Sequence, residues 1–424
     1  MAETLISPGV LARENDSSQI TSQPVQAGAA IVGPTVKGNV NIPTLVTTYS
    51  EYLANFGSTF ESGSDEYSFL TSISAFNYFQ NGGTSLLVTK VASGSFTSAT
   101  SSLIAASAST NNAFTLETLG EGTLMNSDGT YGTNGTLTNG TTDNVRWEIV
   151  NPDLANGVFS VIIRRGNDTN QNKVILETFT NVSLDPKSPN YVARVIGDQT
   201  QTVQGSGTDV YLQTTGNYPN GSRFVRVSSV DKKTPDYFDN NGVAKNAFTS
   251  SIPLAQTGAF GTATGNIVSG MGAAKYYSEI SNTDTQGLLG TNYTTALNLL
   301  ANKDDYRYNI ITAPGLIYEN GATQKTALNS LVSNTENRGD AIVVMDLVNY
   351  NSTIALATST AAEKDSSYVA SYWPWVQITD PDSGQLVFVP ASTMIPGVYA
   401  NNDRTSEAWF APAGINRGGM GNVR

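Results

Sequence analysis

The sequence alternates short apolar strands with helical patterns at both ends, and this alternation stops at Ser93 and returns near Gly287. The interruption begins with residues 93–112, mainly Ser, Thr, Ala and Asn, which predict a linker or loop. Helices that alternate with apolar strands predict a sheet covered by helices. We therefore expect residues 24–92 and 285–424 to form one discontinuous α/β core domain, with mostly-β structure inserted between its two parts.

The first part of this domain is predicted to contain three strands and two helices. Ser64 or Asp65 is the expected N-cap of the second helix, which carries Phe69 and Ile73 on its apolar face. Asn81-Gly82-Gly83 is expected to end that helix. The other predicted elements are strands 29–32, 44–47 and 85–89 and a helix over 50–56.

The inserted region is predicted to be β-rich. We divide it into a β-rich domain over 93–199 and a second inserted or loop-rich region over 200–284, where the signal weakens. Predicted strands cover 145–149, 158–163, 174–179, 210–212 and 224–227, and a helix is expected within 189–196.

The second part of the α/β domain again alternates helices and strands. We predict helices over 293–303 and 323–335 and strands over 309–311 and 341–346, the first strand ending at Pro314. A hairpin of 375–378 and 386–389 is expected about the turn 380–384.

Length and composition exclude several classes of protein. At 424 residues the chain exceeds the size at which a single core stops growing, so two or three domains are expected. The net charge is −12 without a Lys/Arg cluster, so nucleic acid is not an expected partner. Cysteine and histidine are absent, which excludes thiol nucleophiles, the Ser-His-Asp triad and the usual zinc sites.

Several acidic and glycine-rich segments superficially resemble catalytic or binding sites. Asp380 opens a segment like the start of a calcium loop, but its twelfth position is Ala391, so a turn is favoured. The glycine-rich stretch 265–275 has no GK[ST] and favours a flexible loop over a phosphate site. Asp304-Asp305, and Asp143 with Glu148, are paired only in sequence, so we expect solvated charges, no enzyme activity, no cofactor and no metal.

One interpretation of Trp373-Pro374-Trp375 is an aromatic platform that binds a ligand. Burial where a helix meets a strand is the favoured interpretation, because aromatic side chains contribute most to core packing.

Residues 1–23 are predicted to form an extended arm. Leu5, Ile6, Val10 and Leu11 are separated by Ser7-Pro8-Gly9, and no helical period follows. Pro8 forbids a central strand position, but the arm is able to pair with the edge of another sheet. A frayed terminus is the alternative. The N-terminus lacks a signal-peptide pattern, and no apolar stretch approaches the length of a membrane span, so we expect synthesis in a cytoplasm and no direct membrane insertion.

Three groups of motifs are distributed along the chain. The first comprises Ser7-Pro8-Gly9-Val10, the turn Gly33-Pro34-Thr35-Val36-Lys37-Gly38 and a helix ending in Phe56-Gly57. The second comprises Phe179-Thr180-Asn181-Val182-Ser183-Leu184-Asp185-Pro186 and Asn190-Tyr191-Val192. The third comprises Tyr372-Trp373-Pro374-Trp375, Val389-Pro390-Ala391-Ser392, Gly397-Val398-Tyr399-Ala400, Asp403, and Trp409-Phe410-Ala411-Pro412-Ala413-Gly414. In this order and spacing the motifs resemble those of the contractile-tail sheath proteins of bacteriophages and related injection machines.

The resemblance implies a structural subunit of a virion tail, made and assembled in the host cell cytoplasm. Such subunits form stacked hexameric rings around a tail tube, contact the baseplate and tail terminator, and contract to drive the tube through a cell envelope for genome ejection. Residues 5–11 would be the strand that one subunit donates to another. The structural motif residues would be Gly33, Pro34, Lys37, Gly38, Trp373, Pro374, Trp375, Pro390, Gly397, Tyr399, Asp403, Trp409, Pro412 and Gly414.

Sheath proteins similar to this chain usually continue beyond Gly414, so we expect a C-terminal region to be absent and the 424 residues to be mainly monomeric. A β-rich virion adhesin is the alternative function, favoured by the Ser, Thr, Asn and Gly content. A carboxylate-based hydrolase is a third.

Overall fold

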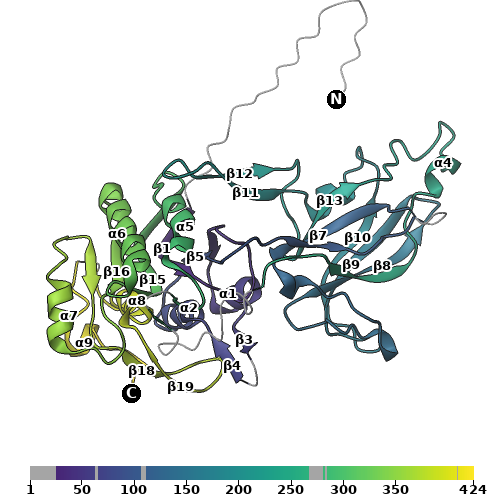
Figure 1. Cartoon of the computed structure of the whole chain (residues 1–424). Coiled ribbons are helices and arrows are strands. Elements are labelled where there is room, and N and C mark those ends of the chain that lie inside the picture. Colours follow the sequence, from purple (N-terminus) through teal and green to yellow (C-terminus); the bar gives the residue numbers. More distant parts are fainter. Residues whose placement is uncertain (1–24, 63–64, 107–110, 267–279, 282–283, 408) are drawn as a thin grey trace, which may run out of the picture.

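The computed structural model describes residues 25–62, 65–106, 111–266, 280–281, 284–407 and 409–424. Two large sheets, one at each end of an elongated molecule, dominate these residues (Figure 1). The fold is therefore mixed α/β with several sheets, in agreement with the expected class. Among the described residues, no helix combines the length and the apolar character needed to cross a membrane.

The six-stranded sheet combines residues from both ends of the chain. Strand β1 lies in its interior and pairs in parallel with β15 on one side and β5 on the other, and only β2 at one edge is antiparallel. In sheet order the strands are β17 (Val369–Ser371), β16 (Ile342–Asp346), β15 (Tyr306–Ile317), β1 (Val25–Gly33), β5 (Leu86–Lys90) and β2 (Thr44–Val46).

This sheet is buried on both faces, which explains its continuous apolar strands. Ala30 and Val32 of β1 belong to one core, and Ala29 and Ile31 belong to the core on the opposite face. The helices of this part of the molecule are α1 (Tyr49–Phe56), α2 (Leu70–Gln80), α5 (Thr294–Leu299), α6 (Gly321–Arg338), α7 (Ile354–Ala361), α8 (Ile395–Thr405) and α9 (Gly414–Arg417), with 3-10 turns η4 (Gly290–Tyr293) and η5 (Ala391–Thr393).

The seven-stranded sheet is built entirely from residues between the two parts of the first sheet, and its strand pairs are antiparallel. Its own core contains Trp147 and Phe159, and short helix α3 (Val192–Ile196) packs there. The strand order is β10 (Ile175–Ser183), β9 (Val158–Arg165), β8 (Val145–Asp153), β14 (Gln256–Gly261), β6 (Ser98–Ser101), β7 (Phe114–Glu121) and β13 (Val225–Val230). Turns η1 (Thr123–Met125) and η2 (Thr133–Gly135) and helix α4 (Asn246–Thr249) complete it.

Three hairpins form separate two-stranded sheets. They are β3 (Thr59–Ser62) with β4 (Asp65–Ser68), β11 (Thr200–Gln204) with β12 (Tyr211–Thr215), and β18 (Val376–Thr379) with β19 (Leu386–Val389). The last is the hairpin expected about the 380–384 turn. The division of the chain into domains at the predicted boundaries remains a prediction.

Three local expectations were wrong. The helix expected from Ser64 or Asp65 begins at Leu70, because the residues before it form β4 and the Leu70 amide donates to the distant side chain of Gln286. The expected linker contains β6, which lies inside the seven-stranded sheet. Strand β15 does not end at Pro314 but continues to Ile317 through a register shift.

Candidate assembly surface and the residues that support it

The proposed strand-donor residues, Leu5 to Leu11, lie outside the described residues, so their role stays a prediction. The first described residues form β1, which lies in the interior of the six-stranded sheet.

The turn that follows β1 is held by close contacts. A Cβ on Gly33 would lie 2.4 Å from Thr71 Oγ1 of α2, so only glycine fits there. Pro34 is buried, and the Lys37 amide donates to the Phe56 carbonyl at 3.0 Å. Gly38 has a φ of +99°, which favours glycine. These motif residues therefore have a packing role.

Polar contacts join this turn to the seven-stranded sheet. Lys37 Nζ lies 3.1 Å from Asp143 Oδ1, and the Val40 amide donates to Glu121 Oε2 at 3.0 Å. Lys90 is fully buried on β5 and donates to the Gly38 carbonyl at 3.2 Å. Burial lowers the pKa of Lys90 to about 8, against the opposing effect of Glu121, and burial raises the pKa of Glu121.

The C-terminal motifs meet at the end of β16. Trp375 is 9% exposed and donates from Nε1 to the Val348 carbonyl at 3.0 Å, which agrees with the burial interpretation. The burial interpretation was wrong for Trp373 and Pro374, which are both exposed and are joined by a cis peptide bond.

Asp346, the last residue of β16, is fully buried and accepts two hydrogen bonds from Ser392. The Ser392 amide donates at 3.2 Å and its hydroxyl at 2.6 Å. Burial raises the pKa of Asp346 to about 7, although these bonds favour the charged form. Pro390 is buried directly before this contact, and its carbonyl accepts from the Thr393 hydroxyl.

Helix α8 packs on α2 through a second close-approach glycine. A Cβ on Gly397 would lie 2.8 Å from the Asn77 carbonyl. Tyr399 is half-buried, and its hydroxyl is hydrogen-bonded to that of Tyr372, whereas Asp403 is exposed.

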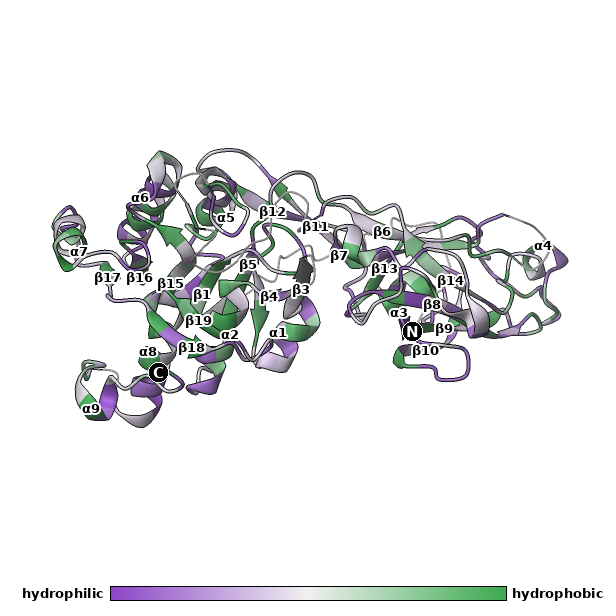
Figure 2. Cartoon of the chain, turned by 60° about the horizontal axis from the view of Figure 1, so that its bottom comes forward, coloured by the Kyte–Doolittle hydropathy of each residue, from purple (hydrophilic) through white to green (hydrophobic). Residues whose placement is uncertain are grey.

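The segment after α8 exposes apolar side chains. Trp409 is 78% exposed and Ile415 is 99% exposed, and Pro412 lies half-buried between them. Gly414 is exposed with a φ of +77° and begins α9, which projects beside α8 in Figure 2.

We define the C-terminal apolar surface as Tyr372, Trp373, Trp409, Phe410 and Ile415. Helix α8 connects its two sides, because Tyr399 contacts Tyr372 and Asn402 Nδ2 donates to the Phe410 carbonyl at 2.9 Å. Large contiguous apolar patches typically mark protein interaction surfaces, whereas single exposed apolar side chains are common on any protein.

Three of the four carboxylates that are paired in sequence, those of Asp143, Glu148 and Asp305, contact other side chains of the fold. Asp143 pairs with Lys37, and Glu148 accepts from Arg164 and Lys173 at 3.0 and 2.7 Å. Asp305 accepts from Asn302, and Asp304 is exposed.

Asp380 is buried and accepts from the Ser383 hydroxyl at 2.6 Å, as in a turn. No group of three or more acidic side chains suited to a metal occurs in the described part of the chain. Most of the glycine-rich stretch lies outside it.

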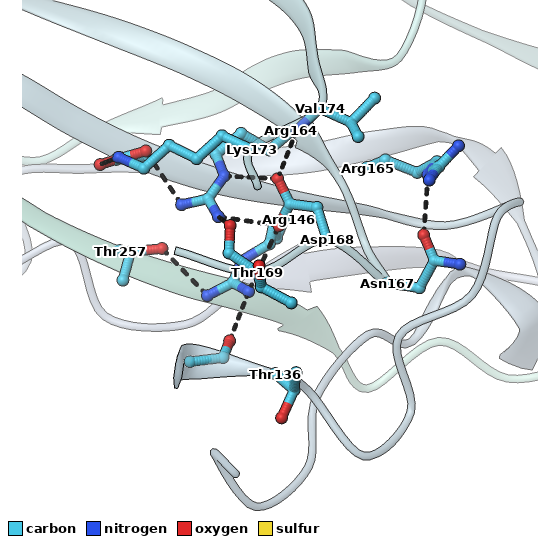
Figure 3. A network of polar contacts seen from close by, with 12 residues as sticks. Thr136, Arg146, Arg164, Arg165, Asn167, Asp168, Thr169, Lys173, Val174 and Thr257 are labelled. Atoms are coloured by element: carbon cyan, nitrogen blue, oxygen red, sulfur yellow. Dashed lines mark hydrogen bonds and ion pairs between the residues drawn. The ribbon is translucent and has the colours of Figure 1, made fainter. Parts of the chain in front are cut away.

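A buried ionic network in the seven-stranded sheet was not anticipated (Figure 3). Arg164 donates two hydrogen bonds to Asp168, each 2.8 Å long, and both side chains are fully buried. Arg146, also buried, lies 3.5 Å from the same carboxylate and donates to the Gly135 carbonyl at 2.7 Å. The network fixes the η2 turn and the β9–β10 loop onto the sheet. The only feature of the sequence that could have indicated this network is the presence of Arg146 and Arg164 within apolar strands.

These features define a mixed α/β fold in which glycines of the first and third motif groups pack on α2, the second group lies in the core of the seven-stranded sheet, and exposed motif residues lie in the C-terminal part of the chain. No protein-family model matches the sequence, and no curated protein matches it.

Solved structures similar to this chain are tail sheath proteins. A sheath tail protein from Listeria innocua is 9% identical over 94% of this chain and 61% of its own, with a TM-score of 0.46. One from Desulfitobacterium hafniense is 11% identical over 93% and 62%, with a TM-score of 0.38. The contracted helical sheath of the anti-feeding prophage is 12% identical over 99% and 59%, with a TM-score of 0.33. This chain thus spans about 60% of the length of each.

Proposed function

We propose that this chain is a structural subunit of a contractile tail sheath. It assembles helically around a tail tube and contracts to drive that tube through a target cell envelope, without catalysis by the chain itself. The baseplate and tail terminator are its proposed partners at the two ends of the tail.

The observation that carries the proposal is the convergence of distant motifs on one helix. Gly33 from the first motif and Gly397 from the third both approach α2 too closely for a side chain, although more than 300 residues separate them. If the motifs resembled those of sheath proteins only through amino-acid composition, we would not expect them to contact the same helix. This packing supports the view that the match to sheath proteins reflects a shared core.

Two surfaces are proposed to join subunits. The arm over residues 5–11 donates a strand to the sheet of another copy, because main-chain hydrogen bonds withstand movement of the bodies that they connect. The C-terminal apolar surface makes the second contact. A different patch meets each neighbour, so the assembly is an open helix built from stacked rings.

Negative-stain electron microscopy of the full-length gene product tests the proposal. We expect hollow tubes, and we expect deletion of residues 1–20 to abolish them while circular dichroism shows an intact fold. Trp409→Ser with Ile415→Ser should also abolish tubes. Ile175→Ser, at an exposed apolar residue on β10, is the matched control and should not.

Tubes that form equally well without residues 1–20 would refute the strand-donor role. A closed trimer that binds glycans would replace the sheath proposal with the adhesin alternative.

A further inference from the structure

The two large sheets have separate apolar cores, and polar contacts join them. The Lys37–Asp143 ion pair and the Glu121 contact lie on one side of this junction. Leu124 packs against both cores. A hollow of about 520 Å³ also opens there, so the sheets are not fused into one core.

Where they leave the seven-stranded sheet, the described ends of the two connecting segments lie side by side. The Thr97 amide donates to the Thr264 carbonyl at 3.1 Å, and the Thr264 amide donates to Thr97 Oγ1 at 2.9 Å. These paired segments, Leu124 and the few polar contacts form a narrow junction without a core of its own, about which the sheets are able to turn.

The β11–β12 hairpin crosses the junction at another place, between α5 and the seven-stranded sheet (Figure 1). Its base is fixed on the side of the seven-stranded sheet. The Val227 amide of β13 donates to the Gly197 carbonyl at 2.8 Å, and Arg226 Nη1, also on β13, donates to the Asp198 carbonyl at 3.5 Å.

The tip of the hairpin is held by the other sheet. Val210 is 9% exposed and belongs to a core of the six-stranded sheet, and Val203 and Leu212 pack against that core. Asn298 of α5 donates from Nδ2 to the Gly207 carbonyl at 2.8 Å.

The middle of the hairpin is not packed on a core. A hollow of about 250 Å³ lies beside it, and the lining includes the polar side chains of Gln201, Thr214 and Arg226. Thr202 and Gln213, the pair at the middle of the hairpin, are both exposed. A lone two-stranded hairpin is marginally stable, so its attachment depends on its two ends.

We propose that the β11–β12 hairpin is a releasable strap that sets the angle between the two sheets. With its tip bound, the sheets keep one orientation. With its tip free, they turn about the paired segments at Thr97 and Thr264. The strap acts within one chain and does not depend on assembly into a sheath.

The test measures the distance between the sheets in solution. The chain has no cysteine, so Gln171→Cys on the seven-stranded sheet and Ala355→Cys on α7 accept spin labels selectively; both positions are exposed. Val210→Asp with Asn298→Ala releases the tip, and Tyr211→Ser is the control on the same hairpin. Hydrogen exchange of residues 200–215 reports release directly.

We expect faster exchange in the hairpin of the releasing variant, together with a shifted or broadened distance distribution, and neither change in the control. If hydrogen exchange of the hairpin becomes faster in the releasing variant but the distance between the spin labels does not change, the proposal is overturned. Unchanged hydrogen exchange in that variant would overturn it as well. Asn298→Ala alone removes the hydrogen bond to the tip and a longer one, 3.4 Å, from Asn334 of α6. If the double variant fails to fold, this variant must show the same two changes to a smaller degree.

Discussion

Replacing Asp346 with asparagine removes the buried carboxylate that accepts from Ser392 while keeping the size of the side chain. Burial raises the pKa of Asp346 from 3.8 to about 7. The folded protein therefore holds this proton more tightly than the unfolded chain does. Raising the pH from below 4 to above 7 consequently destabilises the native protein relative to the variant.

The magnitude follows from the pKa values. At about 1.4 kcal/mol for each pH unit, the interval from 3.8 to about 7 corresponds to about 4 kcal/mol. We expect the free energy of unfolding of Asp346→Asn minus that of the native protein to rise by about this amount between pH 4 and pH 8. Urea denaturation followed by tryptophan fluorescence measures both values.

Asp304→Asn, at an exposed aspartate, is the control for general effects of pH. A difference between Asp346→Asn and the native protein that stays constant from pH 4 to pH 8 would refute the reasoning. It would mean that the hydrogen bonds from Ser392 compensate fully for burial.

Three further substitutions test the packing of the motifs and the ionic network. Trp375→Phe removes the indole donor and leaves a buried carbonyl unsatisfied, so the free energy of unfolding should fall by about 1–3 kcal/mol in urea denaturation. Gly397→Ala places a Cβ 2.8 Å from the Asn77 carbonyl and should cost about 1–3 kcal/mol, seen as a lower melting temperature. Asp168→Asn removes the carboxylate that Arg146 and Arg164 share, so that buried Arg146 loses its ion pair and Arg164 keeps only Glu148, and should cost about 3–5 kcal/mol by the same assays.

Matched controls separate these effects from general sensitivity. Gly419→Ala meets only one atom, at 3.7 Å, and should leave the melting temperature unchanged. Trp409→Phe changes an exposed indole and should not alter the free energy of unfolding. If Asp168→Asn costs no more than a surface substitution, the network does not stabilise the fold.

Elements with a clear apolar pattern were predictable from sequence. Helix α6 lies close to its expected position because its apolar residues recur at helical spacing, and β5 and β16 lie close to theirs because each contains a short continuous apolar run. The start of α2 was missed, because its first amide is satisfied by Gln286, more than 200 residues away. Strand β6 was missed because its short Ser and Thr side chains carry no apolar alternation.

The candidate site was predictable in part. The sequence does not indicate which of the two tryptophans is buried. Trp375 is buried and donates to a backbone carbonyl, whereas Trp373, two residues earlier, is exposed. Asp346 ends a strand that was predicted, but nothing in the sequence indicated that Ser392 would be its partner.

The interior position of β1 has a mechanical consequence. Residue 24 joins directly to the first residue of this strand, and β1 pairs in parallel with β15 and β5 on its two sides. A pull on the N-terminal segment along the strand axis would load these ladders in shear, so many hydrogen bonds would have to break together. Such a strand resists extraction far better than one peeled from an edge, so tension applied at Val25 would act directly on the middle of the sheet.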